Sequence, residues 1–102
     1  MNPRLDNALG LCMKAGKCQS GEFAVETAVK QGKAKLVLLQ TDASENSKKG
    51  YADLCAYYKV PLIMTDNVGK AIGKPSRMAM AVTDESFVKM IMNAKNSEED
   101  RG

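Results

Sequence analysis

The sequence predicts an α/β layer architecture, in which helices alternate with short buried strands. Two observations support this prediction. Residues 36–39 are four large apolar residues in a row, and such a run is typical of a strand that is covered on both faces. Stretches with helical spacing of apolar residues lie before and after this run, and elements that alternate in this way pack into layered α/β domains.

A first helix is expected from Leu5 to Lys14, because its apolar residues recur at helical spacing and Pro3 lies just ahead of it. Residues 15–17 break this helix, and residues 18–20 are expected to form a short edge strand. A second helix is expected to begin at Ser20 and Gly21 and to end at Gly32. Its apolar face is expected to contain four residues: Phe23, Ala24, Ala28 and Val29.

The strand at residues 36–39 follows two lysines, Lys33 and Lys35, which are expected to form a cationic ledge at the start of the strand. Ser44 or Asn46 can cap a third helix that runs to Tyr58. The remaining expected elements are a strand at 62–64, a short helix capped by Asp66 or Asn67 and ended by Gly73, a loop at 74–77, a strand at 78–82 and a last helix from 83–85 onward. Residues 1–96 are expected to form one domain, and residues 97–102 a polar tail.

Composition narrows the classes of function. The chain has no histidine, and its three cysteines include no C-x-x-C pair. This argues against a zinc site, a disulfide framework and histidine-based acid–base catalysis, and favours a reducing cytoplasm as the compartment. The N-terminus carries no long apolar run, so neither a signal peptide nor a membrane anchor is expected.

Enzyme-like motifs are weak. Residues 69–74 superficially resemble a phosphate loop but lack its spacing. The carboxylates at strand ends and helix starts are explained by capping; they are Asp42, Glu45, Asp84 and Glu85. Cys18 lies near Lys14 and Lys17, which can lower a thiol pKa, although a buried or incidental cysteine is the favoured interpretation. We therefore expect no catalytic activity and no cofactor.

Basic residues at turns and helix ends are more informative as a group: Lys14, Lys17, Lys30, Lys33, Lys35, Lys70, Lys74 and Arg77. For any single one of them, a solvated surface side chain is the better interpretation. In an alternating α/β fold, however, the loops at one edge of the sheet lie side by side. Together with the free N–H groups at the start of the second helix, they suit a bent RNA backbone.

A set of segments in a fixed order carries a resemblance to a known family. These segments are 9–17, 20–22, 32–39, 42–46, 57–61, 69–74 and 80–84. They span nearly the whole chain, which resembles the kink-turn RNA-binding ribosomal protein family (the "L seven Ae / L thirty e" superfamily), and in particular its small bacterial members.

The resemblance implies a three-layer α/β/α sandwich of one domain with a four-stranded mixed sheet. It also implies RNA binding through the start of the second helix and the loop before the last strand. The implied partner is structured RNA, either a kink-turn or ribosomal RNA, and with it the ribosome; no membrane and no DNA partner is expected. The RNA-binding residues expected on this basis are Ser20, Gly21, Glu22, Phe23, Lys30, Lys33, Lys35, Asp42, Lys70, Lys74, Pro75, Ser76, Arg77 and Met78.

The family reads its RNA with the pattern G-x-N-E-x-x-K, and this chain departs from it. Gly21 matches the glycine, but Phe23, Ala24 and Thr27 stand where the family has Asn, Glu and Lys. Loss of one good contact to a base costs about 1–3 kcal/mol, so we expect weakened or altered kink-turn affinity. The alternative is a protein–protein module on the same scaffold, with Phe23, Ala24 and the stretch from Met78 to Met80 as an apolar contact patch.

Overall fold

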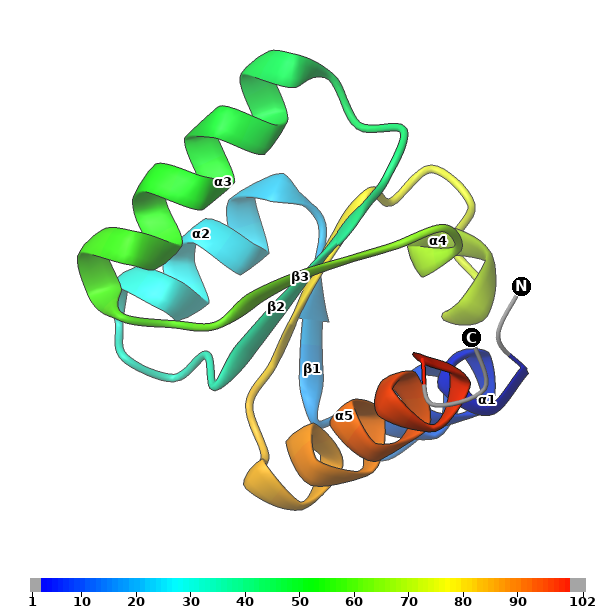
Figure 1. Cartoon of the computed structure of the whole chain (residues 1–102). Coiled ribbons are helices and arrows are strands. Elements are labelled where there is room, and N and C mark those ends of the chain that lie inside the picture. The colour runs from blue at the N-terminus through cyan, green and yellow to red at the C-terminus, as the bar shows by residue number, and fades with distance from the viewer. Residues whose placement is uncertain (1–2, 100–102) are drawn as a thin grey trace.

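The protein is a three-layer α/β/α sandwich (Figure 1). The structure, a computed structural model, describes residues 3–99 and the side chains of residues 3–96. Within this range the elements follow in the order α1 (Pro3–Lys14), β1 (Cys18–Ser20), α2 (Glu22–Lys30), β2 (Leu36–Gln40), α3 (Glu45–Tyr58), β3 (Leu62–Thr65), α4 (Val68–Ala71), β4 (Ala79–Val82) and α5 (Glu85–Glu99). Among these described residues, no helix is both long enough and apolar enough to cross a bilayer.

The sheet is mixed and has the strand order β1-β4-β2-β3. Strand β4 runs antiparallel to both of its neighbours, with Val82 opposite Cys18 on one side and opposite Leu36 on the other. Strands β2 and β3 run parallel. These pairings confirm the expected four-stranded mixed sheet and place β1 at an edge, as the sequence suggested.

Strand β2 lies in the interior of the sheet and is buried on both faces. Leu36 and Leu38 point into a core that is completed by α1, α4 and α5. Val37 and Leu39 point into a second core beneath α2 and α3. Successive side chains of a strand alternate between its faces, so an uninterrupted apolar run serves both cores at once.

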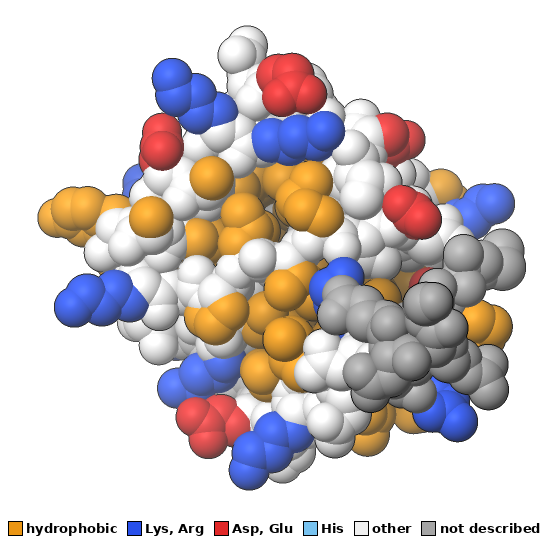
Figure 2. Space-filling model, viewed as in Figure 1, with side chains coloured by type: hydrophobic (Ala, Val, Ile, Leu, Met, Phe, Trp, Pro, Cys, Tyr) orange, Lys and Arg blue, Asp and Glu red, His pale blue; other side chains and the backbone are white. Residues whose placement is uncertain are grey.

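Strand β3 is the other edge of the sheet, and its residues are only partly buried. Figure 2 views the molecule from the side on which β3 crosses in Figure 1, and apolar side chains gather through the centre of that face. Lysine and arginine side chains lie around its rim.

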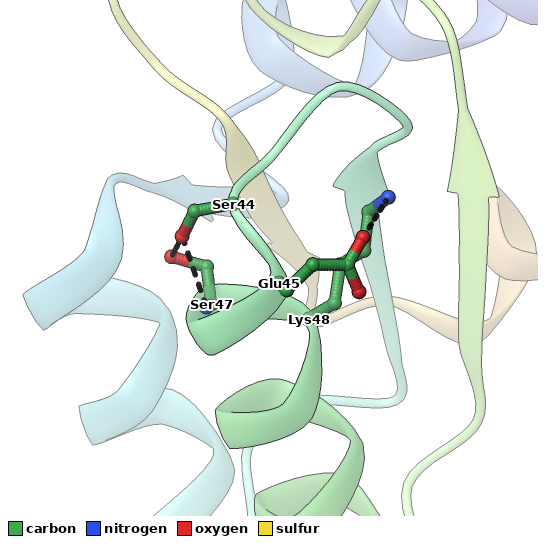
Figure 3. Close-up of polar contacts among 4 residues, drawn as sticks. All are labelled: Ser44, Glu45, Ser47 and Lys48. Carbon is green, nitrogen blue, oxygen red and sulfur yellow. Dashed lines mark hydrogen bonds and ion pairs between the residues drawn. The ribbon is translucent and has the colours of Figure 1, made fainter.

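The start of α3 shows how the sequence sets a helix boundary. Ser44 is the N-cap, and its hydroxyl accepts a hydrogen bond from the Ser47 amide at 3.1 Å (Figure 3). Glu45, in the first turn, pairs with Lys48 at 3.6 Å on the other side of the helix. The cap is therefore Ser44 and not Asn46. A cap of this kind typically contributes about 1 kcal/mol.

Two residues of the expected apolar face of the second helix are not buried, and Ala24 is one of them, because it is partly exposed. Phe23 does not belong to the buried face of α2, because 82% of its surface is exposed. The buried residues of this helix are Val25, Ala28 and Val29.

The expected polar tail overlaps the end of the last helix. The backbone of α5 continues to Glu99, whereas residues 100–102 lie outside the described residues.

Candidate functional site

The candidate site lies at the end of the sheet where strand β4 begins. The Gly21 amide donates a hydrogen bond to the Ala79 carbonyl at 3.1 Å, and the Gln40 amide donates one to the Met78 carbonyl at 2.8 Å. These bonds gather the residues that follow β1, the residues that follow β2 and the loop before β4. Most of the sequence-predicted site therefore comes together here: Ser20, Gly21, Glu22, Phe23, Asp42, Ser76, Arg77 and Met78.

Arg77 lies directly against the start of α2. A Cβ atom built on Gly21 would be 2.5 Å from Nη1 of Arg77. Gly21 is the N-cap of α2 and provides no side-chain hydrogen bond to the helix. A guanidinium group and the N–H groups of a helix start that lacks a side-chain cap therefore share one small region, and both favour a negatively charged ligand there. The Glu22 carboxylate, in the first turn of α2, lines the same cavity as Arg77.

The loop that carries Arg77 is held in place by backbone contacts. The Lys74 amide donates to the Gly69 carbonyl at 2.8 Å, and the Arg77 amide donates to the Lys74 carbonyl at 2.9 Å. Gly69 is packed so closely against the loop that a Cβ there would lie 2.6 Å from the Arg77 carbonyl oxygen. Lys70, Lys74 and Pro75 are exposed around this loop.

Gln40 is a positioning residue that the sequence reasoning missed. Its Oε1 accepts a hydrogen bond from the Gly69 amide at 3.3 Å, and its Nε2 donates one to Oδ1 of Asp42 at 2.8 Å. The Gln40 side chain thus links α4 to the turn after β2. Asp42, predicted as an RNA-binding residue, uses Oδ1 to orient this glutamine. A polar residue that ends a wholly apolar strand was the available signal.

A cavity of about 450 Å³ opens beside Arg77. Its walls come from the start of α2, the start of α3 and residues 76–79, and Leu39 contributes an apolar surface. Ser44, Ser47 and Glu22 add hydrogen-bonding groups. An apolar surface with a few polar groups at its edges suits a flat, partly polar ligand.

Phe23 lies next to this region and, at 82%, is the most exposed large apolar side chain among the described residues. Ala24 and Thr27 are partly exposed. Met78 is also exposed, at 38%, but Ala79 and Met80 are buried. An apolar contact patch over residues 78–80 is therefore wrong, because β4 lies inside the sheet and is covered on both faces, which leaves only Met78, just before the strand, at the surface.

The remaining predicted lysines lie at the opposite end of the sheet, where β4 ends. The Lys35 amide bonds to the Val82 carbonyl, whereas Gly21 bonds to Ala79, three residues away on β4; this separation is roughly 10 Å. Lys33 and Lys35 are exposed, while Lys30 forms an ion pair with Glu26 at 2.7 Å. The ledge therefore exists, but it is not contiguous with the start of α2.

The cysteines are buried. The pKa of Cys18 is lowered, chiefly because the neighbouring Cys12 side chain hydrogen-bonds to it, and the Cys12 pKa is correspondingly raised. The expected influence of Lys14 and Lys17 is not among the causes. Burial supports the interpretation of Cys18 as a structural residue.

Comparison with known proteins adds family relationships. A family model described as the ribosomal protein L7Ae/L30e/S12e/Gadd45 family matches residues 4–92. The RNA-binding protein YlxQ of Bacillus subtilis (strain 168) is 42% identical over 88 residues, which cover 83% of this chain and 88% of that protein. The RNA-binding protein YlxQ of Enterococcus faecium is 40% identical over 86 residues, which cover 81% of this chain and 82% of that protein.

Two solved structures share the fold. A Bacillus halodurans C protein of unknown function superposes with a TM-score of 0.83 at 33% identity, covering 92% of this chain and 97% of that one. The Giardia lamblia 15.5kD RNA binding protein superposes with a TM-score of 0.73 at 16% identity, covering 95% of this chain and 86% of that one. At that identity the second likeness concerns the fold alone.

Proposed function

The chain belongs to the ribosomal protein L7Ae/L30e/S12e/Gadd45 family, and we propose that it is a non-catalytic protein that binds structured RNA. Two relatives at 40% identity or more carry the name RNA-binding protein, which supports RNA as the ligand. The finer proposal is that the RNA contains a kink-turn or is ribosomal, and that kink-turn specificity is weakened or altered.

The observation that carries this proposal is the contact between Arg77 and Gly21 at the start of α2. Helix N-termini bind phosphate through free N–H groups, and a guanidinium group forms charge-assisted hydrogen bonds with phosphate oxygens. Both features converge at one point of this surface. A phosphate of a sharply bent backbone would be held there, and the adjoining cavity would receive a base turned out of the stack.

Phe23 defines the expected difference from other family members. It replaces an asparagine that reads a base edge in the family pattern, and an aromatic ring offers no such hydrogen bonds. Its high exposure instead supports stacking on an unpaired base, an interaction that every base can make. The protein would consequently hold RNA by shape, charge and stacking, with less base discrimination than the family pattern provides.

Lys33 and Lys35 would add positive charge at the other end of the sheet, where β4 ends. At roughly 10 Å from the start of α2, they are suited to phosphates farther along the RNA and not to the kink itself. Lys70 and Lys74 flank the Arg77 loop. We expect these four lysines to contribute affinity that depends on salt but not on the kink.

The test is a gel-shift titration of the full chain against a kink-turn RNA and a straight duplex of equal length and composition, at several salt concentrations. We expect tighter binding to the kink-turn, with an affinity that falls linearly with salt on a log–log plot. Equal affinity for the two RNAs would remove the kink-specific part of the proposal. No salt-dependent binding to either RNA would remove the proposal as a whole.

The second candidate is the protein–protein module on the same scaffold, and one observation favours it. Phe23 and Met78 are both exposed near the same helix start, and exposed apolar side chains that lie together are typical of protein-binding surfaces. The absorbance ratio of the purified protein separates the candidates, because co-purifying RNA raises absorbance at the nucleic-acid wavelength. A protein free of nucleic acid that also fails the titration supports the protein–protein module.

A further inference from the structure

A groove of about 570 Å³ runs between α2 and α3, on the helical layer next to the proposed RNA surface. Along α3 its wall extends from Asn46 to Tyr58, a length of roughly 18 Å at the rise of an α-helix. Gly50 lies in the middle of this wall and leaves it open. The groove is long enough for about five extended residues of another chain.

The groove is acidic, although the protein as a whole carries a charge of +3. It is lined by the carboxylates of Glu22, Glu26 and Asp53, and by a single lysine, Lys30, which is paired with Glu26 at 2.7 Å. Glu22 and Glu26 are four residues apart on α2, and like charges at this spacing destabilise a helix. The groove therefore retains a repulsive pair that a cationic ligand would relieve.

Tyr51 gives the groove a hydrogen-bonding group. Only 7% of its surface is exposed and its side chain lines the groove. Its hydroxyl forms no hydrogen bond with any described residue, and because no buried side-chain oxygen or nitrogen among these residues lacks a partner, this oxygen is open to solvent at the groove. Burial raises the pKa of Tyr51 to about 12, and Glu22 and Glu26 add to this effect. The phenol thus stays neutral in an acidic setting, with an oxygen that is free to accept a hydrogen bond.

Aromatic rings border the far end of the groove. Tyr57 is 79% exposed, and its ring meets that of Tyr58 edge to face, with centroids 4.9 Å apart. A cation over an exposed aromatic face gains a favourable interaction with the ring. Leu54 and the tyrosine rings also provide apolar surface for the aliphatic stems of long basic side chains.

We propose that the α2–α3 groove binds an arginine- and lysine-rich segment of a partner protein. One cationic group would donate a hydrogen bond to the Tyr51 hydroxyl between the carboxylates of Glu22 and Glu26. A second would lie near Asp53 and Tyr57. The length of the groove and its apolar wall favour a peptide over a small polyamine, and its acidity repels RNA. The groove meets the cavity beside Arg77 at the start of α2, because Glu22, Ser47 and Tyr51 line both.

The test uses the full chain labelled with ¹⁵N and an acetylated hexa-arginine peptide, without RNA. We expect amide shifts confined to α2 and α3, and an affinity that falls as salt rises. A glycine-serine peptide of the same length should produce no shifts. Shifts scattered over the surface, or an equal response to the neutral peptide, would overturn the proposal. Spermidine binding at the same groove as tightly as the peptide would overturn the peptide as its occupant.

Matched variants sharpen the result. Glu26→Gln with Asp53→Asn should weaken peptide binding by about tenfold, because each removes a carboxylate that would pair with the peptide. Glu45→Gln is the control, since this carboxylate lies on α3 outside the groove and pairs with Lys48 (Figure 3). Tyr51→Phe should weaken binding several-fold without lowering the melting temperature, because the hydroxyl has no partner among the described residues. Equal loss in the control, or no loss in the other variants, would refute the proposal.

Discussion

The guanidinium of Arg77 occupies the space in which a side chain at Gly21 would begin. A Cβ atom on Gly21 would lie 2.5 Å from Nη1 and 3.2 Å from Cζ of Arg77. The backbone of Gly21 also has φ 95° and ψ 152°, a region that is essentially restricted to glycine. One missing side chain therefore allows two distant parts of the sequence to meet at the start of α2.

Gly21→Ala is expected to lower both stability and RNA affinity. The free energy of unfolding should fall by about 1–3 kcal/mol, because alanine is strained at this backbone conformation. RNA affinity should fall because the new methyl group displaces the guanidinium. Denaturant unfolding and the gel-shift titration measure the two effects separately.

Gly16→Ala is the matched control for this variant. Gly16 also has a positive φ, of 70°, but no atom lies within 4 Å of the position that the new methyl group would take, so the control carries backbone strain without touching Arg77. We expect it to lose stability and to keep its RNA affinity. If both variants lose RNA affinity in proportion to stability, displacement of Arg77 is not the cause.

Gly69→Ala is expected to shift the whole Arg77 loop. The added methyl group would lie 2.6, 2.8 and 2.9 Å from the carbonyl oxygens of Arg77, Lys74 and Pro75, all of them backbone atoms. We expect a lower melting temperature and weaker RNA binding. Gly50→Ala, on open α3 surface, should instead raise the free energy of unfolding by about 0.5–1 kcal/mol. A Gly69→Ala protein with the stability of the wild type would contradict the packing described here.

The sequence was sufficient to predict the layers of the fold, because the strongest patterns were local. The apolar run from Leu36 to Leu39 predicted a strand that is buried on both faces, as β2 is. Ser44 correctly predicted the start of α3, and Gly32 the end of α2. The mixed sheet itself followed from the resemblance to a family. Strand order depends on pairing between distant segments, which local periodicity does not contain.

The site was predicted only in part, for geometric reasons. The helical spacing of the apolar residues near Phe23 predicts that this residue is buried, but Val25 is the residue that is actually buried. Lys33 and Lys35 are predicted to share one surface with Arg77, but the length of α2 separates them from it. A helix of nine residues is about 13 Å long, so the two ends of α2 lie at opposite ends of the strands.

Tyr51 predicts a pH dependence of stability. Its pKa rises from 10.0 to about 12 on folding, so the folded protein holds this proton more tightly than the unfolded chain. The stability that this group contributes is fully present below about pH 10 and should be lost as the pH rises from about 10 to about 12. Tyr51→Phe should show a shallower decrease over that range in denaturant unfolding. Lysine titration affects both proteins alike, so identical curves would show that burial of the phenol does not matter.

Arg77→Ala is expected to weaken RNA binding and to reduce the slope of log affinity against log salt by about one unit. The reason is the loss of one cation that contacts phosphate. Lys89→Ala removes the same charge from an exposed position on α5, in the opposite helical layer. It should change neither quantity appreciably. An equal effect of the two variants in the gel shift would mean that net charge, and not the position of Arg77, determines binding.

Restoring the family pattern should restore the preference for a kink-turn over a straight duplex. Phe23→Asn, Ala24→Glu and Thr27→Lys replace side chains that are exposed or partly exposed, so the core is preserved and the melting temperature should change little. The new groups can hydrogen-bond to base edges, and each good contact contributes about 1–3 kcal/mol. We expect the ratio of kink-turn to duplex affinity to rise by at least about tenfold. Phe23→Ala alone should lower affinity for both RNAs, because it removes the stacking surface without adding a side chain that can hydrogen-bond to a base edge. If the triple variant gains affinity equally for the kink-turn and the duplex, the added lysine has acted only through its charge, and the start of α2 does not face the kink.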